Sequence, residues 1–377
     1  MALTTSIKKP RVLHCFRLPK GGVFRHVSDL VRGQSERGLS VGVVCDSDFN
    51  DNFADEVLDE LDALCELGVQ RMSISRTLGF SDIAAGRQIA GICRYEKPQI
   101  IHGHGAKGGA YARMLGSHLG IKSVYTPHGG SLHYAANSAL GLIYLGLEKI
   151  LKKRSDGLIF ESHYSADTYE AKLGALPCGR KVIHNGLSEN EFDQWSGMDG
   201  EYDFVFVGEI RKLKGIDTLL EAAARLKSTG LKVLIVGSGP DEEYFMNRIE
   251  ALGIGKQITV SPPVFPATDA FNQGKCVVIP SLAESFPYIV LEALAAGVPL
   301  ITTNVGGIPE IFGPYYSELL IPGNVDLLVK AMSVQMENQE KAFRHSVEIK
   351  EYVRTQFSMD NMQDEIIAYY DQILRDK

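Results

Sequence analysis

Two glutamates, Glu284 and Glu292, are the side chains in this sequence whose types and surroundings best suit binding chemistry. The residues around them predict a strand, a loop, a helix and a second strand in succession. These are Cys276–Ile279, the loop that carries Glu284, Tyr288–Ala296 with Glu292, and Pro299–Thr303. Open α/β sheets bind ligands at the carboxyl ends of their strands. The order of elements therefore favours ligand binding, although two isolated glutamates would more often be solvated surface acids.

Glycines and cations gather in other loops that follow predicted strands of the same half of the chain. The loop GEIRKLKG, from Gly208 to Gly215, supplies Arg211, Lys212 and Lys214, and two further glycine turns follow later strands. Glycine permits close approach of the backbone to a ligand, and free N–H groups at a helix start bind anions. Cations beside such a turn favour a phosphate site. Several such loops on one sheet edge predict a phosphate-bearing ligand next to the two glutamates.

The amino-terminal half begins with a similar arrangement. A predicted strand, Arg11–Phe16, leads through Gly21 and Gly22 into a predicted helix, Val23–Arg37, which carries His26. The pattern KGGVFRH lacks the third glycine of the dinucleotide fingerprint, and this argues against a dehydrogenase. His26 alone would more often be a packing residue.

Histidines end the next predicted strands. His102 and His104 follow one strand, and His128 with Gly129 follows its neighbour. Carboxyl ends of parallel strands meet at one rim, so we expect these imidazoles to lie together and to make polar contacts with a ligand. Three histidines also leave a metal site open as an alternative. We expect no metal, because no carboxylate stands at a suitable spacing.

A basic amphipathic helix is predicted over 137–154. Cations at a helix carboxyl end interact well with the helix dipole, which is the simpler explanation. The alternative is a basic face, flanked by apolar residues, that rests on an anionic membrane surface.

Composition limits the remaining classes. The chain has 377 residues, enough for two domains, and its net charge of −7 argues against nucleic acid as a partner. Six scattered cysteines fit buried thiols in a reducing compartment. With no signal-peptide pattern and no membrane-span pattern, we expect a cytoplasmic protein.

Strands and helices alternate along the chain and restart once, which predicts two parallel α/β domains. We place the first over 1–187, the second over 188–357, and a last helix over 358–377. We expect a polar linker over Leu187–Glu201 after the first domain, and a strand over Glu318–Ile321 in the second.

Four motifs now point to a family: KGGVFRHV, VIHNG, VGEIRKLKG and ESFPYIVLE. Together, from about residue 11 to about residue 357, the chain resembles the retaining nucleotide-sugar glycosyltransferases of family 4. The last motif is the most specific, since Glu284 and Glu292 fit the family's pair of acids. The resemblance implies the GT-B architecture, with two facing Rossmann-like domains and a carboxyl-terminal helix crossing back to the first. It also implies closure of the two domains on the donor about a hinge.

The resemblance also implies roles for single residues. Glu292 would bind the ribose diol, Glu284 and His128 would contact the donor sugar, and Lys214 with Arg211 or Lys212 would neutralise the diphosphate. The family usually has an arginine where Glu209 stands, and Arg211 is the expected substitute. The remaining predicted site residues divide between two groups. The donor-binding group consists of Gly21, Gly22, Gly208, Ser285, Phe286 and Pro287. The acceptor-side group consists of His26, His102, His104 and Gly129.

The function that follows is transfer of a hexosyl group from a nucleotide sugar to a saccharide acceptor. We expect a UDP-sugar before a GDP-sugar, no required cofactor, and a lipid-linked acceptor used in surface or exopolysaccharide synthesis. The protein would then be peripheral on the inner face of the cytoplasmic membrane. The alternatives are a nucleotide-sugar epimerase or a phosphorylase of the same architecture, or a non-catalytic nucleotide-sugar-binding protein.

Overall fold

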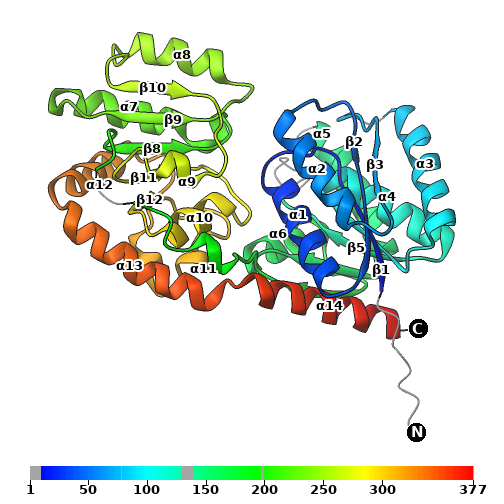
Figure 1. Ribbon diagram of the computed structural model, residues 1–377. Coiled ribbons are helices and arrows are strands. Elements are labelled where there is room, and N and C mark those ends of the chain that lie inside the picture. Colours follow the sequence, from blue (N-terminus) through cyan, green and yellow to red (C-terminus); the bar gives the residue numbers. More distant parts are fainter. Residues whose placement is uncertain (1–9, 78, 130–138, 197–198, 377) are drawn as a thin grey trace, which may run out of the picture. The chain divides into compact units, whose positions relative to one another are not determined.

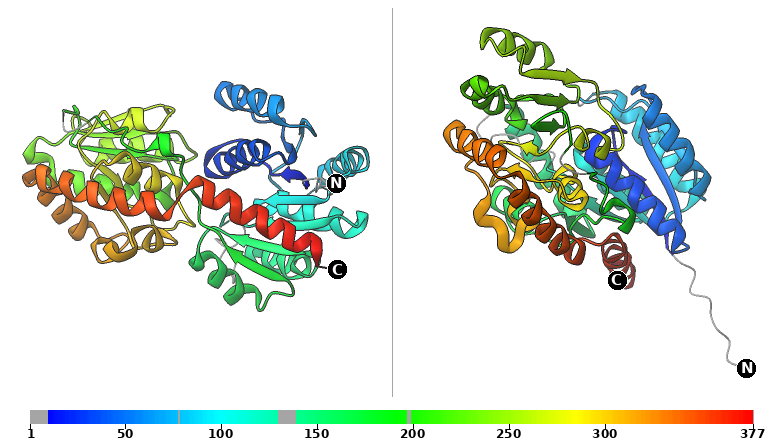
Figure 2. Two further views of the ribbon diagram at one scale, coloured as in Figure 1. Left: turned by 60° about the horizontal axis from the view of Figure 1, so that its bottom comes forward. Right: turned by 60° about the vertical axis from the view of Figure 1, so that its left-hand side comes forward.

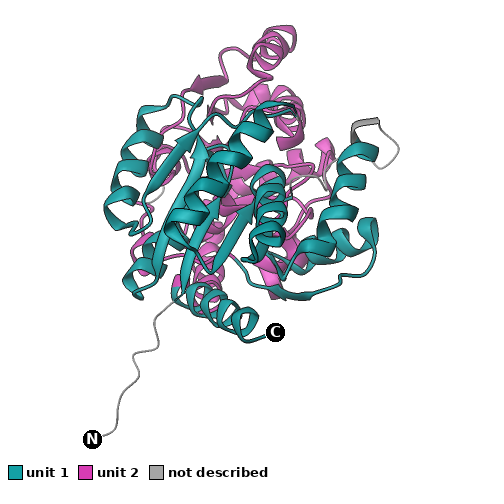
Figure 3. Ribbon diagram, turned by 90° about the vertical axis from the view of Figure 1, so that its right-hand side faces the viewer, with its two compact units in different colours: residues 1–184, 360–377 teal, residues 185–359 magenta. Residues whose placement is uncertain are grey.

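The chain divides into two compact units in a computed structural model that describes residues 10–77, 79–129, 139–196 and 199–376. The first unit comprises residues 1–184 and 360–377, and the second comprises residues 185–359 (Figures 1 and 3). The borders lie close to those predicted at residues 187 and 357.

The first unit is built on a parallel sheet of seven strands within the described residues, in the order β3-β2-β1-β4-β5-β6-β7. Apolar runs fill the central strands, as expected for strands covered on both faces. The strands are β1 (Arg11–Cys15), β2 (Ser40–Asp46), β3 (Val69–Met72), β4 (Ile100–His104), β5 (Lys122–Thr126), β6 (Gly157–Phe160) and β7 (Gly179–Val182).

Helices connect these strands, and local sequence sets several of their ends. Asp51 caps one helix by accepting a hydrogen bond from the Ala54 amide at 3.0 Å, and Gly120 ends another in the left-handed conformation. The helices are α1 (Gly21–Glu36), α2 (Asn52–Leu64), α3 (Ser81–Glu96), α4 (Gly105–Leu119), α5 (Ala139–Leu151, followed by a 3₁₀ turn, Lys152–Arg154) and α6 (His163–Leu173).

The last helix, α14 (Met359–Arg375), belongs almost entirely to the first unit and lies alongside its sheet (Figure 2). The Tyr370 hydroxyl lies 2.6 Å from Nδ1 of His102 in β4, and the Tyr369 hydroxyl donates to the Gly179 carbonyl at 2.6 Å. Both contacts are part of a packed interface, since Tyr370 is fully buried. Residues from the far end of the sequence thus complete the packing against the sheet of the first unit.

The second unit repeats the design with a parallel sheet of five strands in its described part, in the order β10-β9-β8-β11-β12. The strands are β8 (Phe204–Val207), β9 (Val233–Val236), β10 (Ile258–Ser261), β11 (Val277–Ile279) and β12 (Leu300–Thr302). The helices are α7 (Ile216–Leu226), α8 (Glu242–Ala251), α9 (Thr268–Phe271), α10 (Tyr288–Ala296), α11 (Ile308–Phe312), α12 (Val325–Glu337) and α13 (Gln339–Gln356), with 3₁₀ turns at Glu189–Glu191, Lys212–Lys214, Lys227–Thr229 and Gly313–Glu318.

The predicted linker over Leu187–Glu201 is wrong as a description of its described residues. Leu187, Phe192 and Trp195 are 2%, 7% and 9% exposed and belong to the core of the second unit. The Trp195 indole also donates a hydrogen bond to the Gly274 carbonyl at 3.3 Å. Because most residues of the segment are polar, the sequence pattern did not indicate these three apolar anchors. The segment is part of the second unit.

Two other expectations about elements can be settled. The strand predicted over Glu318–Ile321 is a single bridge between Thr303 and Leu320, because a 3₁₀ turn occupies the chain up to Glu318. The six cysteines are unpaired, and five of them are buried, as predicted. Within the described ranges, none of the helices has the length and apolar character needed to cross a membrane.

Replacing Trp195 by alanine is expected to lower the free energy of unfolding of the second unit by about 3–5 kcal/mol, the usual cost of deleting a buried tryptophan. Because Trp195 is the one tryptophan in the sequence, the measurement is chemical denaturation followed by circular dichroism. The exposed neighbour Gln194→Ala is the control and should change stability by less than about 0.5 kcal/mol. Equal, small effects of both substitutions would contradict packing of this segment.

Candidate functional site

The predicted loops of the second unit meet where its strand order reverses. Strand β8 is hydrogen-bonded to β9 on one side and to β11 on the other, so the loops after β8 and β11 leave the sheet at its switch point. Open α/β sheets form ligand crevices at this position. Lys214 comes from the loop after β8, and Glu284 from the loop after β11.

An ion pair joins these two loops. The Lys214 ammonium lies 2.6 Å from Oε1 of Glu284, which also accepts a hydrogen bond from the Ser281 hydroxyl at 2.7 Å. Glu284 is 9% exposed, whereas the Lys214 side chain is 25% exposed. The glutamate is therefore held in place by two donors, while the lysine retains a face toward solvent.

Glycines allow the loops around this pair to pack backbone against backbone. A Cβ at Gly215, which has a φ of +72°, would lie 1.8 Å from the Pro280 carbonyl oxygen. A Cβ at Gly306 would lie 2.0 Å from the carbonyl oxygen of Glu284, and one at Gly237 would lie 1.9 Å from that of Gly208. No side chain fits at these distances, so three loops at this edge require glycine.

The three cations of the loop after β8 differ in their surroundings. The ammonium of Lys212 lies 3.9 Å from the centre of the Tyr244 ring, and its backbone amide donates to Asp241. Arg211 is about half exposed and lies 3.9 Å from Glu209, a distance that gives a weak surface pair. Arg211 and Lys214 are thus the two cations of the loop that suit an anionic ligand, and Glu209 stands beside Arg211.

Glu292 lies on α10, which begins directly after the Glu284 loop. Pro287 occupies the position before the first helical residue, with extended backbone. Phe286 is 4% exposed, and its carbonyl accepts a hydrogen bond from the Asn185 amide at 3.2 Å. Ser285 and Glu292 are half-buried. The start of α10 is thereby fixed, and the N–H groups of a helix start suit an anion.

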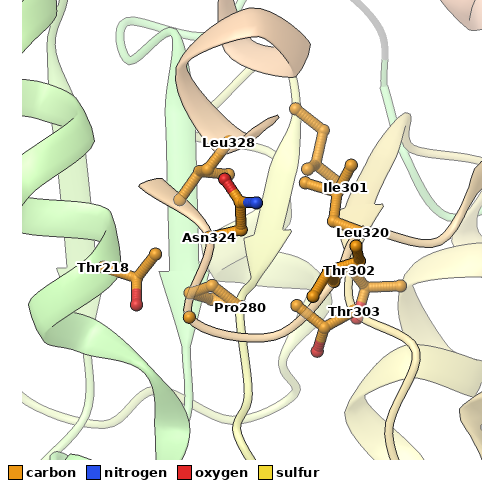
Figure 4. Close-up of a pocket in the computed structure, with 10 residues that line it drawn as sticks. Thr218, Pro280, Ile301, Thr302, Thr303, Leu320, Asn324 and Leu328 are labelled. Carbon is orange, nitrogen blue, oxygen red and sulfur yellow. The ribbon is translucent and has the colours of Figure 1, made fainter. Parts of the chain in front are cut away.

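A small cavity lies behind this edge of the sheet and has room for about one water molecule, at ≈ 10 Å³. Thr218, Pro280 and Thr303 are among the residues around it (Figure 4). It is too small for a nucleotide or a sugar. Its mixed lining of threonines and aliphatic side chains belongs to the packing that supports the Pro280 loop.

The predicted histidines of the first unit do gather at one place. His104 lies between two others: its Nε2 is 3.1 Å from Nδ1 of His14, and its Nδ1 is 3.1 Å from Nε2 of His128. The His26 ring lies 4.9 Å from the His128 ring, centre to centre. The rings of His102 and His104 lie 4.0 Å apart, centre to centre, and are tilted by 36° to each other. Five imidazoles from β1, α1, β4 and the loop after β5 form one cluster.

Burial decides the character of this cluster. His14, His102 and His104 are 0%, 0% and 1% exposed, and burial lowers the pKa of each, that of His14 to about 4. These three imidazoles are therefore neutral at physiological pH.

The prediction that His102 and His104 contact an acceptor needs correction. The ring nitrogens of His102 lie 2.6 Å and 2.8 Å from the hydroxyls of Tyr370 and Thr126, and both nitrogens of His104 face other histidines. These two side chains act inside the protein. The other two acceptor-side residues are buried as well: His26 is 1% exposed, and Gly129 is buried. Gly21 and Gly22, predicted to bind the donor, lie exposed at the start of α1.

Sequence reasoning missed Glu161, whose carboxylate pairs with Nδ1 of His128 and is 3% exposed. Burial favours a raised pKa for this carboxyl, but the charge and hydrogen bond of His128, with the charge of His26, lower it overall. Glu161 directly follows β6, so the same strand-end argument that found His128 would have found it. Tyr370 and Gln34 carried no such signal.

Two groups of three histidines in the described residues have ligand nitrogens within 4.8 Å of one another: His14 with His102 and His104, and His26 with His104 and His128. The spacing of these nitrogens would allow a metal ion to bind, but hydrogen bonds already join His104 to His14 and to His128. The absence of a required metal stays a prediction.

Two family models cover most of the sequence. Residues 20–191 match the model described as Glycosyltransferase Family 4, and residues 188–355 match the one described as Glycosyl transferases group 1. The chain belongs to these glycosyltransferase families. The predicted family resemblance is confirmed.

Relatives and solved structures agree with this family. A D-inositol 3-phosphate glycosyltransferase of Mycobacteroides abscessus is 28% identical over 247 residues, covering 59% of this chain and 55% of the relative. One from Segniliparus rotundus is 28% identical over 244 residues, covering 59% and 54%. The chain thus spans about half the length of these curated relatives.

Sucrose-phosphate synthase from Thermosynechococcus elongatus superimposes with a TM-score of 0.79 at 17% identity, covering 97% of this chain and 100% of that one. Anabaena HepE in complex with UDP gives a TM-score of 0.78 at 15% identity, covering 96% and 100%. These similarities confirm the predicted fold class: parallel sheets flanked by helices, of the GT-B type.

Replacing Gly215 by alanine tests the glycine-dependent packing. Gly230 offers a matched control, because its φ of +75° resembles the +72° of Gly215 while a Cβ there meets open space. Both variants bear the strain of an alanine in the left-handed region, about 1–3 kcal/mol. Only Gly215→Ala also meets the Pro280 carbonyl, which should cost about 1–3 kcal/mol more. Urea denaturation measures the difference, and equal destabilisation would show that the loops do not depend on this contact.

Proposed function

We propose that this protein is a retaining glycosyltransferase that moves a hexosyl group from a nucleotide sugar to a saccharide acceptor. The observation that carries the proposal is the Lys214–Glu284 pair at the switch point of the second sheet, surrounded by loops that only glycine permits. A cation with a solvent face beside a fixed carboxylate suits a ligand with both phosphate and hydroxyl groups. A nucleotide sugar has both.

The donor would engage the second unit through groups of complementary chemistry. Lys214 and Arg211 neutralise the diphosphate, together with N–H groups at the start of α10 around Ser285 and Phe286. Glu292, on the second turn of α10, accepts hydrogen bonds from the ribose diol, and Glu284 accepts from sugar hydroxyls. Gly208 keeps the intervening backbone free of a side chain.

In the first unit, the exposed glycines Gly21 and Gly22 at the start of α1 offer backbone N–H groups to phosphate. His128 follows β5 and is the member of the histidine cluster that is not fully buried. We assign it to the donor sugar, as the family resemblance implies. Its ring nitrogens face Glu161 and His104, so a sugar hydroxyl would take the place of one of these two partners.

The chemistry follows from charge. Departure of the nucleotide builds negative charge on the diphosphate, which Lys214 and Arg211 stabilise more strongly than they stabilise the ground state. Positive charge develops on the sugar. Retention fits a front-face route in which the departing phosphate accepts the proton of the acceptor hydroxyl, so that neither an enzyme nucleophile nor a metal is required.

A UDP-sugar is our preferred donor. Support comes from HepE, which was solved with UDP and with UDP-glucose and has the same fold at 15% identity. Saccharide acceptors in surface polysaccharide synthesis are supported by WaaG, a glycosyltransferase involved in lipopolysaccharide biosynthesis, with a TM-score of 0.71 at 14% identity.

A lipid-linked acceptor is supported by α5 and the turn that follows it. Leu142, Ile143 and Ile150 are 65%, 56% and 61% exposed, and Lys149, Lys153 and Arg154 are close to them in sequence. Exposed apolar side chains beside cations suit the surface of an anionic bilayer. We therefore propose a cytoplasmic protein that associates with the inner membrane face.

Thermal shift against UDP, GDP, ADP and their sugar conjugates tests the donor site. A ligand at a hundredfold excess over its Kd should stabilise the folded protein by about 2.7 kcal/mol. The shift should fall in Lys214→Ala and Glu292→Ala, each weakening binding at least tenfold, about 1.4 kcal/mol. Lys227→Ala, at the carboxyl end of α7, is the control. A shift without transfer to any acceptor would favour the non-catalytic alternative, and nucleotide release without acceptor would favour an epimerase.

Flotation with liposomes of rising anionic lipid content tests the membrane proposal. Changing Lys149, Lys153 and Arg154 to glutamate should abolish binding, since each cation near an anionic surface contributes about 1 kcal/mol. Three glutamates at Lys227, Lys330 and Lys341 change the net charge equally and should leave binding intact. Failure of the parent protein to float at any lipid composition would remove the membrane from the proposal.

A further inference from the structure

The loops that follow β1, β2 and β3 are tied together at the carboxyl edge of the first unit's sheet, where these strands are neighbours. The Arg17 carbonyl, beyond the end of β1, accepts a hydrogen bond from the Asp46 amide at 2.8 Å. The Asp46 carboxylate accepts one from the amide of Ile74, beyond the end of β3, at 2.9 Å. Asp46 and Ile74 are 5% and 1% exposed. The backbone beyond the three strands is therefore held in a fixed arrangement.

Three cationic residues belong to these strand ends. Arg17 follows β1 and is half-buried, whereas Arg76 follows β3 and is exposed. Lys20 immediately precedes α1, and its ammonium lies 5.9 Å from the centre of the Phe49 ring in the loop after β2. We call Arg17, Lys20 and Arg76 the cation cluster.

The cation cluster lacks bound counter-charges. Across the part of the chain that the structure describes, no ion pair or side-chain hydrogen bond joins any of its three members to a carboxylate, and the first turn of α1 contains no acidic residue. Burial lowers the pKa of Arg17, Asp46 raises it, and the charge of Arg76 lowers it again. The two guanidinium groups are thus close enough to repel each other, and an added anion would relieve this repulsion.

The carboxylates of the same loops already have donors of their own. Asp46 accepts hydrogen bonds from two backbone amides, and Oδ2 of Asp48 accepts one from the Ser73 hydroxyl at 2.6 Å. Asp82, at the start of α3, is paired with the Lys107 ammonium at 2.6 Å. These acids are engaged in building the loops, which leaves the cation cluster available to a ligand.

The backbone that carries Arg76 is held before any ligand binds. The Thr77 carbonyl accepts hydrogen bonds from the Lys107 ammonium at 2.9 Å and from the Ser75 hydroxyl at 2.8 Å. Arg76 lies between Ser75 and Thr77, directly after the buried Ile74. A loop held in this way loses little conformational freedom on binding, which favours affinity.

We propose that the cation cluster binds an oxyanion, either a phosphate or a carboxylate, that the saccharide acceptor carries. Guanidinium groups bind both kinds of oxyanion through two parallel N–H···O bonds, and a lysine adds a point charge. Assignment of this oxyanion to the acceptor rests on the proposed function. There, Lys214 and Arg211 of the second unit already match the diphosphate of the donor, so a further anion belongs to the other substrate.

Steady-state kinetics with neutral, phosphorylated and carboxylated saccharide acceptors tests this assignment. Transfer should favour one of the two anionic classes. Arg17→Gln and Arg76→Gln should each raise the KM for that acceptor about tenfold to hundredfold, the range for a lost charged hydrogen bond, and leave the KM for the donor unchanged. Arg17→Lys keeps the charge but not the planar fork, so its KM should lie between those of the parent and Arg17→Gln.

Calorimetry tests the binding without transfer, with glucose 6-phosphate, glucuronate and glucose as probes. The full chain carries Lys214→Ala, so that the proposed donor site contributes less to anion binding. At least one anionic probe should bind more tightly than glucose, and Arg17→Gln or Arg76→Gln should weaken it at least tenfold. Binding of glucose 6-phosphate alone would assign a phosphate, and binding of glucuronate alone would assign an acidic sugar.

Arg94→Gln is the matched control, because Arg94 is an exposed arginine in the last turn of α3 and its loss changes the net charge equally. This variant should bind the anionic probe as the parent does. The proposal is overturned if neither anion binds better than glucose, or if Arg94→Gln weakens binding as much as the cluster variants do. Since Arg76 is exposed, Arg76→Gln remains informative even if a substitution at the half-buried Arg17 destabilises the protein.

The two proposals can fail separately. If a nucleotide sugar binds and is used with neutral acceptors alone, at rates that the cluster variants leave unchanged, the proposed function stands and the oxyanion site fails. If no nucleotide sugar binds, but an anionic probe binds and is lost in the cluster variants, the oxyanion site stands and the proposed function fails.

Discussion

The contact between the Gly215 turn and the Pro280 carbonyl is the constraint on which the second unit's site depends. Two loops leave adjacent strands in parallel, and they can meet only if one of them has no side chain at the point of contact. Once they meet, Lys214 reaches Glu284 and Ser281 supports the same oxygen. The ion pair is therefore a product of backbone packing. Its charges do not have to hold the loops together, and the lysine is free to face a ligand.

The two units solve the same positional problem with different chemistry. Each places its polar groups at the carboxyl edge of a parallel sheet, near the point where strand order reverses. The second unit uses charged groups that are partly solvated and suited to an anion. The first uses neutral imidazoles whose charge burial suppresses, with one carboxylate at the edge of the cluster.

Sequence reasoning found most of the fold and the second unit's site, because both rest on local signals. Apolar runs, glycine turns and the pair Glu284 and Glu292 stand close together along the chain. It failed where contacts between distant parts of the sequence determine the structure. Leu187, Phe192 and Trp195 of the supposed linker are buried only because they pack into the core of the second unit. The partners of His102 lie on an adjacent strand and on a helix 268 residues away. The contact of His102 with Tyr370 brings α14 against this cluster, and no local pattern encodes that.

The position of α14 also affects how the chain is made. Tyr370 completes hydrogen bonding inside the first sheet, and Ile373 packs where a side chain on Gly157 would lie. During synthesis, the strands of the first unit emerge long before these residues, and the whole second unit emerges between them. The second unit is continuous in sequence and can fold as it leaves the ribosome. The first must wait with an uncovered strip of sheet until the last turns of the chain appear, so a nascent chain passes through a stage in which its later half is native and its earlier half is not.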